Sequence, residues 1–202
     1  MRKVFILALL ILSAFLTACG GGGGGGSSVG SGAGGGSGSG GGGGDGGSGG
    51  GSGAGMTWTL RTSPMAKILF DVTYGDGRFV AVGQDGVILT STDGVNWSAR
   101  ASGTSEWLKG VTYGDGKFVA VGEAGTILTS SDGVNWTERT SPTREWLEGV
   151  TYGDGKFVAV GFYSTILVST DGVNWMRATS VPSGYDLNGV TYGNGKFVAV
   201  GD

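Results

Sequence analysis

Histidine is absent from this 202-residue sequence, and cysteine occurs only once. Without histidine the chain has no Ser-His-Asp triad, no Cys-His pair and no histidine-ligated metal. A single cysteine excludes an intrachain disulfide and a zinc cluster built from thiolates. The sequence therefore predicts no metal site, and no pattern in it indicates a cofactor.

Charged side chains are also scarce, with 13 Lys and Arg against 16 Asp and Glu. A nucleic-acid-binding domain carries a basic patch or stripe, which a slightly acidic chain with dispersed charges does not offer. We therefore expect no nucleic-acid partner.

Glycine, by contrast, is abundant and unevenly placed. Of the 47 glycines, 25 fall within the 36 residues from 20 to 55, where they are mixed mainly with serine. Such a tract cannot bury apolar surface and behaves as a random coil, so it is predicted to be a flexible linker. Residues 56–202 have the composition of a folded domain.

The long hydrophobic run of the chain lies at its N-terminus. Residues 1–3 give a basic start, and an almost unbroken apolar run follows from Val4 to Phe15. Because this run is too short for a permanent transmembrane helix, residues 1–18 are predicted to form a signal peptide.

The segment Leu16-Thr17-Ala18-Cys19-Gly20 then resembles the lipobox of bacterial lipoproteins. The resemblance implies cleavage before Cys19 and a diacylglyceryl group on its sulfur, so that residues 19–55 comprise a lipidated cysteine and the linker. Several acyl chains on one residue anchor a protein stably. We therefore expect an exported protein anchored by lipid to a bacterial cell envelope. The absence of Asp after Cys19 favours the outer membrane if the cell is Gram-negative. An ordinary secretory signal with an unmodified cysteine is the alternative.

The folded part repeats itself. A segment Gly-Val-Thr-Tyr-Gly-Asp/Asn-Gly-Lys/Arg-Phe-Val-Ala-Val-Gly recurs with units starting near Val72, Val111, Val150 and Val190, at offsets of 39, 39 and 40 residues. A fixed period near 40 residues is typical of arrays whose units cannot bury their apolar face alone.

Each unit carries the signals of four short strands, which we name a to d. In the second unit, strand a ends at Tyr113, strand b is Lys117–Gly122, strand c is Thr126–Ser130 and strand d is Asn135–Arg139. Asp-Gly pairs between β-rich runs favour tight hairpin turns. Strand b has no polar alternation, which indicates a strand covered on both faces. The sequence therefore predicts an all-β fold, a β-propeller of four-stranded antiparallel blades.

The connection between strands c and d carries a further motif, Ser-Thr/Ser-Asp-Gly-Val-Asn-Trp. It resembles the Asp box of sialidase-type (BNR-like) and photosystem II assembly-factor-like propeller repeats of bacteria, although it is one residue shorter than the Asp-box pattern. The resemblance covers residues 58–202 and implies structural roles: the Asp caps turn backbone donors and the Trp packs between blades. The residues concerned are Asp93, Trp97, Asp132, Trp136, Asp171 and Trp175.

A sialidase, by the same resemblance, needs three convergent arginines, a Tyr–Glu pair and an acidic Asp. Here Arg61, Arg100, Arg139 and Arg177 fall at similar repeat positions, which distributes them one to a blade. The repeated aspartates lie in turns, whereas retaining glycosidases need two carboxyl groups close together. We therefore predict no catalytic residues and a non-catalytic binding or assembly module. A glycan-binding or sialidase-like glycoside hydrolase relative is the alternative.

The candidate binding surface follows from strand alternation. The a–b and c–d turns lie at one face of a blade and are nearly identical between repeats, whereas the b–c and d–a connections lie at the other face and vary. Binding residues concentrate on variable loops of a rigid scaffold. This face is therefore predicted to bind an unknown protein or glycan. Its candidate residues are Glu106, Trp107, Arg144, Glu145, Trp146, Phe162, Tyr163 and Tyr185. Alternatively, Trp107 and Trp146 only plug the ends of blades.

The predicted strands make about 3.7 units: a strand d at Trp58, three full units, and strands a and b of a last unit. A strand at Trp58 is predicted to act as a strand d for a composite last blade, whose strand c is missing. The ring is therefore expected to be incomplete. A longer parent sequence, an open array with an exposed edge, and closure by a second chain all fit this pattern.

Overall fold

The computed structural model describes residues 5–9, 59–179 and 184–202. The predictions for Cys19, for the glycine-rich linker and for Trp58 lie outside these residues. Within the described part, no helix has both the length and the apolar character needed to cross a membrane.

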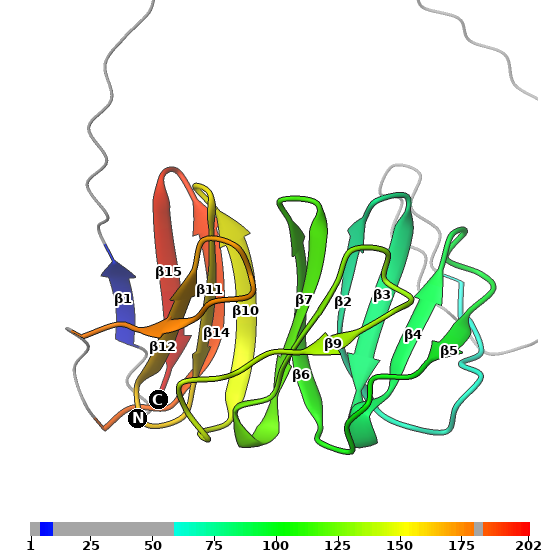
Figure 1. Cartoon of the computed structure of the whole chain (residues 1–202), viewed down its shortest axis with the longest axis horizontal. Helices are drawn as coiled ribbons and strands as arrows, with labels where there is room; N and C mark the ends of the chain where they lie inside the picture. Colours follow the sequence, from blue (N-terminus) through cyan, green and yellow to red (C-terminus); the bar gives the residue numbers. More distant parts are fainter. Residues whose placement is uncertain (1–4, 10–58, 180–183) are drawn as a thin grey trace, which may run out of the picture. The chain divides into compact units, whose positions relative to one another are not determined.

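Three four-stranded antiparallel sheets follow one another along the chain, and each pairs its strands in sequence order (Figure 1). They are the predicted blades, so the fold is an all-β propeller whose ring is not closed among the described residues. Blade 1 comprises β2 (Leu69–Gly75), β3 (Arg78–Gly83), β4 (Ile88–Ser91) and β5 (Ser98–Arg100). Blade 2 comprises β6 (Leu108–Gly114), β7 (Lys117–Gly122), β8 (Ile127–Ser130) and β9 (Thr137–Glu138). Blade 3 comprises β10 (Leu147–Gly153), β11 (Lys156–Gly161), β12 (Thr165–Ser169) and β13 (Met176–Arg177).

A fourth, three-stranded sheet contains β14 (Leu187–Gly193), β15 (Lys196–Gly201) and β1 (Phe5–Leu9). Strand β1 pairs antiparallel with β15, with Ile6 opposite Val200 and Leu7 opposite Ala199. In blade 3, Ile166 and Leu167 of β12 take the same places opposite β11. The fourth unit was expected to lack a strand c, and β1 occupies the place of that strand. Residues 59–62, which follow Trp58, form no strand.

The a–b hairpins turn as the sequence predicts. Asp115 and Gly116 both adopt positive φ, 46° and 70°, which matches the right-handed twist of the flanking strands. Glycine adopts this conformation without steric cost, and aspartate tolerates it better than most residues.

The c–d connections differ from the prediction. Strand d of the second unit is the two-residue β9, and Trp136 lies before it rather than within it. The cause is the carboxylate of the Ser-Thr/Ser-Asp-Gly-Val-Asn-Trp segment, which we call the Asp box after the motif that it resembles: Asp132 Oδ1 accepts hydrogen bonds from the N–H groups of Val134 and Asn135, both at 2.8 Å, and holds them outside the strand ladder.

The hydrophobic core lies between neighbouring blades. Val80, Val82 and Ile88 of blade 1 pack with Leu108 and Phe118 of blade 2, and the same arrangement recurs between blades 2 and 3. Strand b is thus covered on both faces, which explains its lack of polar alternation. Because each blade buries its apolar face only against the next, a single repeat has no core of its own.

Candidate binding face

The b–c loops and the starts of strand a lie together at one end of each blade. In blade 2 the loop is the short helix η2 (Glu123–Gly125), whose Glu123 N–H donates to the carbonyl oxygen of Trp107 at 3.0 Å. In blade 3 the N–H of Phe162 donates to Trp146 in the same way at 2.9 Å. The backbone therefore fixes the candidate aromatic residues on a rigid frame.

A cluster of rings around one lysine joins the three blades at this end. The Nζ atom of Lys109 lies 4.5 Å from the ring centre of Phe70 in blade 1, 4.9 Å from that of Trp107 and 5.8 Å from that of Trp146 in blade 3. At these distances the ammonium group is attracted to the ring faces. We call Phe70, Trp107, Lys109, Glu123 and Trp146 the Lys109 cluster.

Glu123 adds a carboxylate to this cluster. Its Oε1 lies 3.9 Å from Lys109 Nζ, and both side chains are largely buried, with 14% and 15% of their surfaces exposed. Burial raises the pKa of Glu123 above its usual range; Lys109 opposes this rise, and the nearby Glu106 and Glu148 add to it. The cluster therefore holds a partly desolvated charge pair, and a bound polar group can interact with it more strongly than in water.

The two candidate tryptophans have different surroundings. Trp107 is half-buried; its indole N–H donates to Asp85 Oδ1 of blade 1 at 3.2 Å, and its ring packs on Phe70 with centres 5.7 Å apart. These contacts support the role of a plug between blades. Trp146 leaves 42% of its surface exposed and stacks on Phe162 with ring centres 5.4 Å apart. An exposed, stacked ring on a fixed backbone is a suitable anchor for a partner.

The b–c loop of blade 3 has the same backbone as the loops of blades 1 and 2, but a serine stands where they have glycine. Tyr163 and Ser164 both have positive φ, 52° and 55°, whereas blades 1 and 2 have Gly86 and Gly125 at the second position. Ser164 is held there by its N–H bond to the carbonyl oxygen of Tyr185 at 2.6 Å. Tyr163 itself is 67% exposed. A serine held in a conformation that favours glycine is a strained position, and strained positions cluster at functional sites.

The charged candidates lie on the d–a connections beside these rings. Glu106 and Glu145 are half-buried, and their N–H groups donate to the hydroxyls of Thr104 and Thr143. Arg144 is exposed and lines a pocket of about 430 Å³ together with Arg139.

Three members of the Lys109 cluster were not among the predicted binding residues: Phe70, Lys109 and Glu123. A signal was present for each: the second residue of strand a varies as Phe70, Lys109, Glu148 or Asn188, and the first residue of the b–c loop varies as Gln84, Glu123 or Phe162. Variation at one position of a repeated strand marks a surface that the blade core does not constrain.

The Asp boxes form closed hydrogen-bond sets at the other connections. Ser130 Oγ donates to Asp132 Oδ1 at 2.9 Å, and Asn135 Nδ2 donates to Oδ2 at 2.8 Å. The Trp136 indole N–H donates to the Gly133 carbonyl at 3.1 Å. Hydrogen bonds from the backbone N–H groups of Asn135 and Val134, and then from the side chains of Asn135 and Ser130, hold the pKa of Asp132 well below its usual range. These groups satisfy the carboxylate within its own hairpin.

The arginines of strand d lie on separate blades. Arg100 Nε donates to Thr90 at 2.9 Å, and Arg139 Nε donates to Thr129 at 2.8 Å, in each case within the same blade. They do not converge on one point as a carboxylate-binding triad would.

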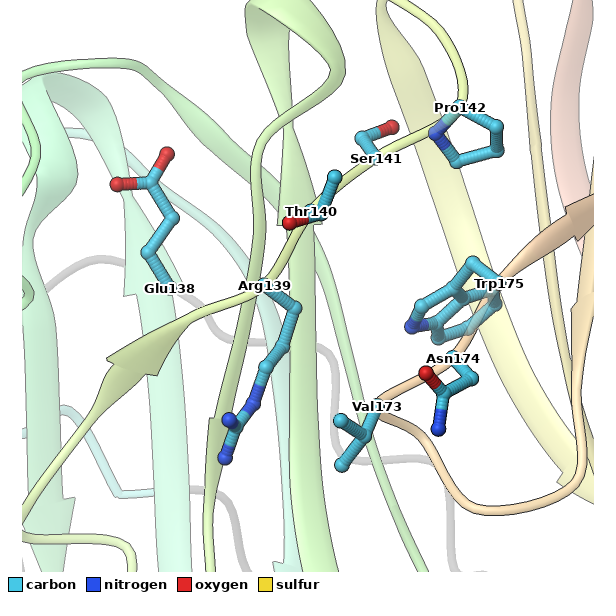
Figure 2. A pocket seen from close by; sticks show the side chains of 8 residues that line it. All are labelled: Glu138, Arg139, Thr140, Ser141, Pro142, Val173, Asn174 and Trp175. Atoms are coloured by element: carbon cyan, nitrogen blue, oxygen red, sulfur yellow. The ribbon is translucent and has the colours of Figure 1, made fainter.

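A pocket of about 400 Å³ lies between residues 138–142, at and after the end of strand β9, and residues 173–175 of the c–d connection of blade 3 (Figure 2). Its one carboxyl group belongs to Glu138, which points away from Arg139 in Figure 2. This pocket therefore does not supply the two facing carboxyl groups of a retaining glycosidase. Among the described residues, no group of three or more Asp, Glu or Cys side chains is arranged to hold a metal ion.

Solved structures similar to this chain share the propeller fold. One is YCF48 bound to a D1 peptide, with a TM-score of 0.56 and 17% identity over 67% of this chain and 47% of that one. Another is YCF48 from Cyanidioschyzon merolae, with a TM-score of 0.50 and 26% identity over 57% of this chain and 38% of that one. The match therefore spans less than half the length of either YCF48 chain.

A putative glycoside hydrolase from Parabacteroides distasonis is more distant, with a TM-score of 0.37 and 13% identity over 58% of this chain and 53% of that one. No protein-family model and no curated protein sequence matches the chain.

Proposed function

We propose that this chain is a lipid-anchored protein of the bacterial cell envelope whose propeller is a non-catalytic binding module for an extended segment of a protein partner. The b–c and d–a loops form the binding face. The lipid at Cys19 and the glycine-rich linker keep the propeller close to the membrane but clear of it. By the square-root rule for flexible chains, the linker spans roughly 30–36 Å.

The observation that carries the proposal is the Lys109 cluster with its neighbours Phe162 and Tyr163. It combines exposed rings, a partly desolvated charge pair and a backbone fixed by hydrogen bonds. Rigid aromatic anchors beside buried charges are the usual centre of a protein-binding surface. The YCF48 propeller bound to a D1 peptide supports a peptide as the class of partner.

A peptide selection tests the proposed face. The chain is used to enrich binders from a random peptide display library, and the affinity of an enriched, labelled peptide is measured by fluorescence anisotropy. Trp146→Ala is expected to weaken binding by about tenfold or more, because a central aromatic anchor contributes at least about 2 kcal/mol. Met176→Ala is the matched control, since Met176 is 72% exposed on strand β13, outside the face. Equal affinity for wild type and Trp146→Ala would contradict the proposal.

A glycan array and a sialidase assay on the same protein test the other candidate. Glycan capture that Trp146→Ala abolishes, without peptide enrichment, would replace the peptide with a carbohydrate ligand. Turnover of a sialoside would show an enzyme and overturn the non-catalytic assignment.

The lipid anchor is tested separately. A bacterium expressing the chain is fed an alkyne-labelled fatty acid, and the label is expected on the wild type but not on Cys19→Ser. Membrane fractionation then shows whether the anchored protein is in the outer membrane, and protease treatment of intact cells shows whether the propeller faces outward as in an adhesin. An unlabelled wild-type protein released from the cell would contradict the lipid anchor and favour an ordinary secretory signal with an unmodified cysteine.

A further inference from the structure

Neighbouring blades are joined by a repeated contact between a tyrosine and a glycine. The ring of Tyr113 in blade 2 lies on Gly75 of blade 1 so closely that a Cβ atom on Gly75 would come within 2.0 Å of the ring. Tyr152 covers Gly114 and Tyr192 covers Gly153 in the same way, each at 2.1 Å. A glycine at the end of strand a is thus a socket for the tyrosine of the following blade, and it occurs at every junction in the described chain.

A second repeated contact crosses the junction in the opposite direction, from a blade to the one that follows it. Lys117 at the start of strand b in blade 2 donates from Nζ to the carbonyl oxygen of Asp171, in the Asp box of blade 3, at 2.9 Å. Arg78 of blade 1 reaches the Asp box of blade 2, where its Cδ would lie 2.8 Å from a Cβ on Gly133. The cation of one blade therefore extends over the Asp box of the next.

Each end of the array presents one open half of this junction. A Cβ built on Gly193 would meet no atom of the described chain within 4 Å, so this socket is empty. At the opposite end, Tyr74 is 58% exposed and has no preceding socket among the described residues. Lys196 is exposed and pairs with Gly193, and Asp93 belongs to the Asp box of the same blade as Tyr74.

Valine side chains on these two end surfaces are also more exposed than their counterparts inside the array. Val72 of blade 1 is 56% exposed, whereas its counterparts Val111 and Val150 are only 4% and 8% exposed. In the last sheet Val200 is 41% exposed, whereas its counterpart Val160 is fully buried. Both faces are therefore blade surfaces that the inner junctions cover.

We propose that a second copy of this chain binds here head to tail. Tyr74 of one copy enters the socket at Gly193 of the other, and Lys196 reaches the Asp93 carbonyl across the new junction. A second copy is the occupant favoured by the structure because three junctions within the chain use this same pair of surfaces. The two surfaces differ, so one copy of a pair keeps its Gly193 socket free and the other keeps its Tyr74 surface free, and association continues until a ring closes or a filament forms.

The test uses the 202-residue chain with Cys19→Ser, which prevents lipidation, in a mild detergent that keeps the apolar N-terminal run in solution. Sedimentation velocity follows its mass over a range of concentrations. The parent chain is expected to associate. Tyr74→Ala and Gly193→Leu are each expected to weaken association by about tenfold or more, because each damages one side of every junction. Met176→Ala, outside both surfaces, should associate like the parent.

Mixing the two variants gives the decisive result. Tyr74→Ala retains an intact socket and Gly193→Leu retains an intact tyrosine, so an equal mixture is expected to form a dimer with one copy of each. Circular dichroism and thermal unfolding check that both variants remain folded. If Tyr74→Ala does not fold, Val72→Ser replaces it; if Gly193→Leu does not fold, Lys196→Ala replaces it. A parent chain that stays monomeric would overturn the proposal. So would self-association of Gly193→Leu as strong as that of the parent, which indicates symmetric pairing or pairing through the edge of β1.

Discussion

The Asp-box aspartates stabilise the hairpins by accepting hydrogen bonds in their charged form. In all three boxes the carboxylate accepts two backbone N–H groups and an asparagine side chain. In each box the hydrogen bond from the backbone N–H of the asparagine is the largest cause of the lowered aspartate pKa. The pairs are Asp93 with Asn96, Asp132 with Asn135, and Asp171 with Asn174. Charge on these groups therefore favours the folded state.

This predicts a loss of stability in acid. A carboxyl group whose pKa is lower in the folded state contributes stability above its unfolded pKa, here 3.8, and loses it as the pH falls toward the folded value. The urea midpoint of the wild type should therefore fall below about pH 4. The triple variant Asp93→Asn, Asp132→Asn, Asp171→Asn should be less stable at neutral pH and should show a smaller drop in acid. Asp115→Asn, in an a–b turn, is the control. Parallel pH profiles for wild type and triple variant would contradict this account.

The glycine sockets give a prediction about packing. Gly114→Ala places a methyl group against the ring of Tyr152, so it should lower the free energy of unfolding by about 1–3 kcal/mol, as overpacking does. Gly193→Ala is the matched control, because a Cβ there meets no described atom; it should change stability by less than about 0.5 kcal/mol. Urea unfolding at a protein concentration low enough to avoid association measures both. Equal effects at the two positions would show that the ring does not sit on Gly114 as described.

At the scale of elements, strand b was the best predicted part of the fold. Its expected bounds, Lys117–Gly122, are those of β7, because an unbroken apolar run between two turn signals leaves little choice of register. Strand d was the worst: it shrank to two residues because the Asp-box carboxylate holds the backbone donors that a longer strand needs. Competition between a side chain and the strand ladder is difficult to read from propensity alone.

The pairing of β1 with β15 also lay outside sequence reasoning. Residues 5–9 were assigned to a signal peptide, and their hydrophobicity fits either a leader or a buried strand. The match becomes visible only in the register, where Ile6 and Leu7 stand where strand c of blade 3 has Ile166 and Leu167.

Removal of residues 1–18 should therefore expose the free edge of β15. In a chain from residue 19 to 202, the amides of residues 197–201 are expected to exchange with deuterium faster than in the full chain, since they lose a pairing strand. Residues 157–161 are the internal control, because β12 still pairs with them in both chains. Hydrogen exchange read by mass spectrometry makes the comparison. Unchanged protection at residues 197–201 would mean that β1 does not cover this edge.

At the scale of the whole molecule, one set of connections is constrained and the other is not. The Asp-box turns carry side-chain hydrogen bonds that every blade repeats, and the a–b turns need residues that tolerate positive φ, so the sequences of both repeat; the b–c loops repeat the backbone, with positive φ in each, without repeating the sequence. The b–c and d–a loops vary and hold the exposed rings of Trp146 and Tyr163. Sequence alternation alone was sufficient to place these loops on one face.

The interior of the candidate site could not be predicted in the same way. Phe70, Lys109 and Trp146 come from three blades and meet only because strands β2, β6 and β10 pack side by side. A repeat pattern predicts the strands of one blade. The way neighbouring blades pack decides which side chains of one blade contact those of the next. The ion pair of Lys109 with Glu123 depends on that packing and on the fold of the b–c loop.

Hydrogen exchange of the full chain, with and without a saturating selected peptide, tests the location of the binding face most directly. The account predicts new protection at the b–c and d–a loops, centred on residues 144–148 and 162–164, with the a–b turns and Asp boxes unchanged. Protection confined to the a–b turns or to the Asp-box hairpins would contradict it.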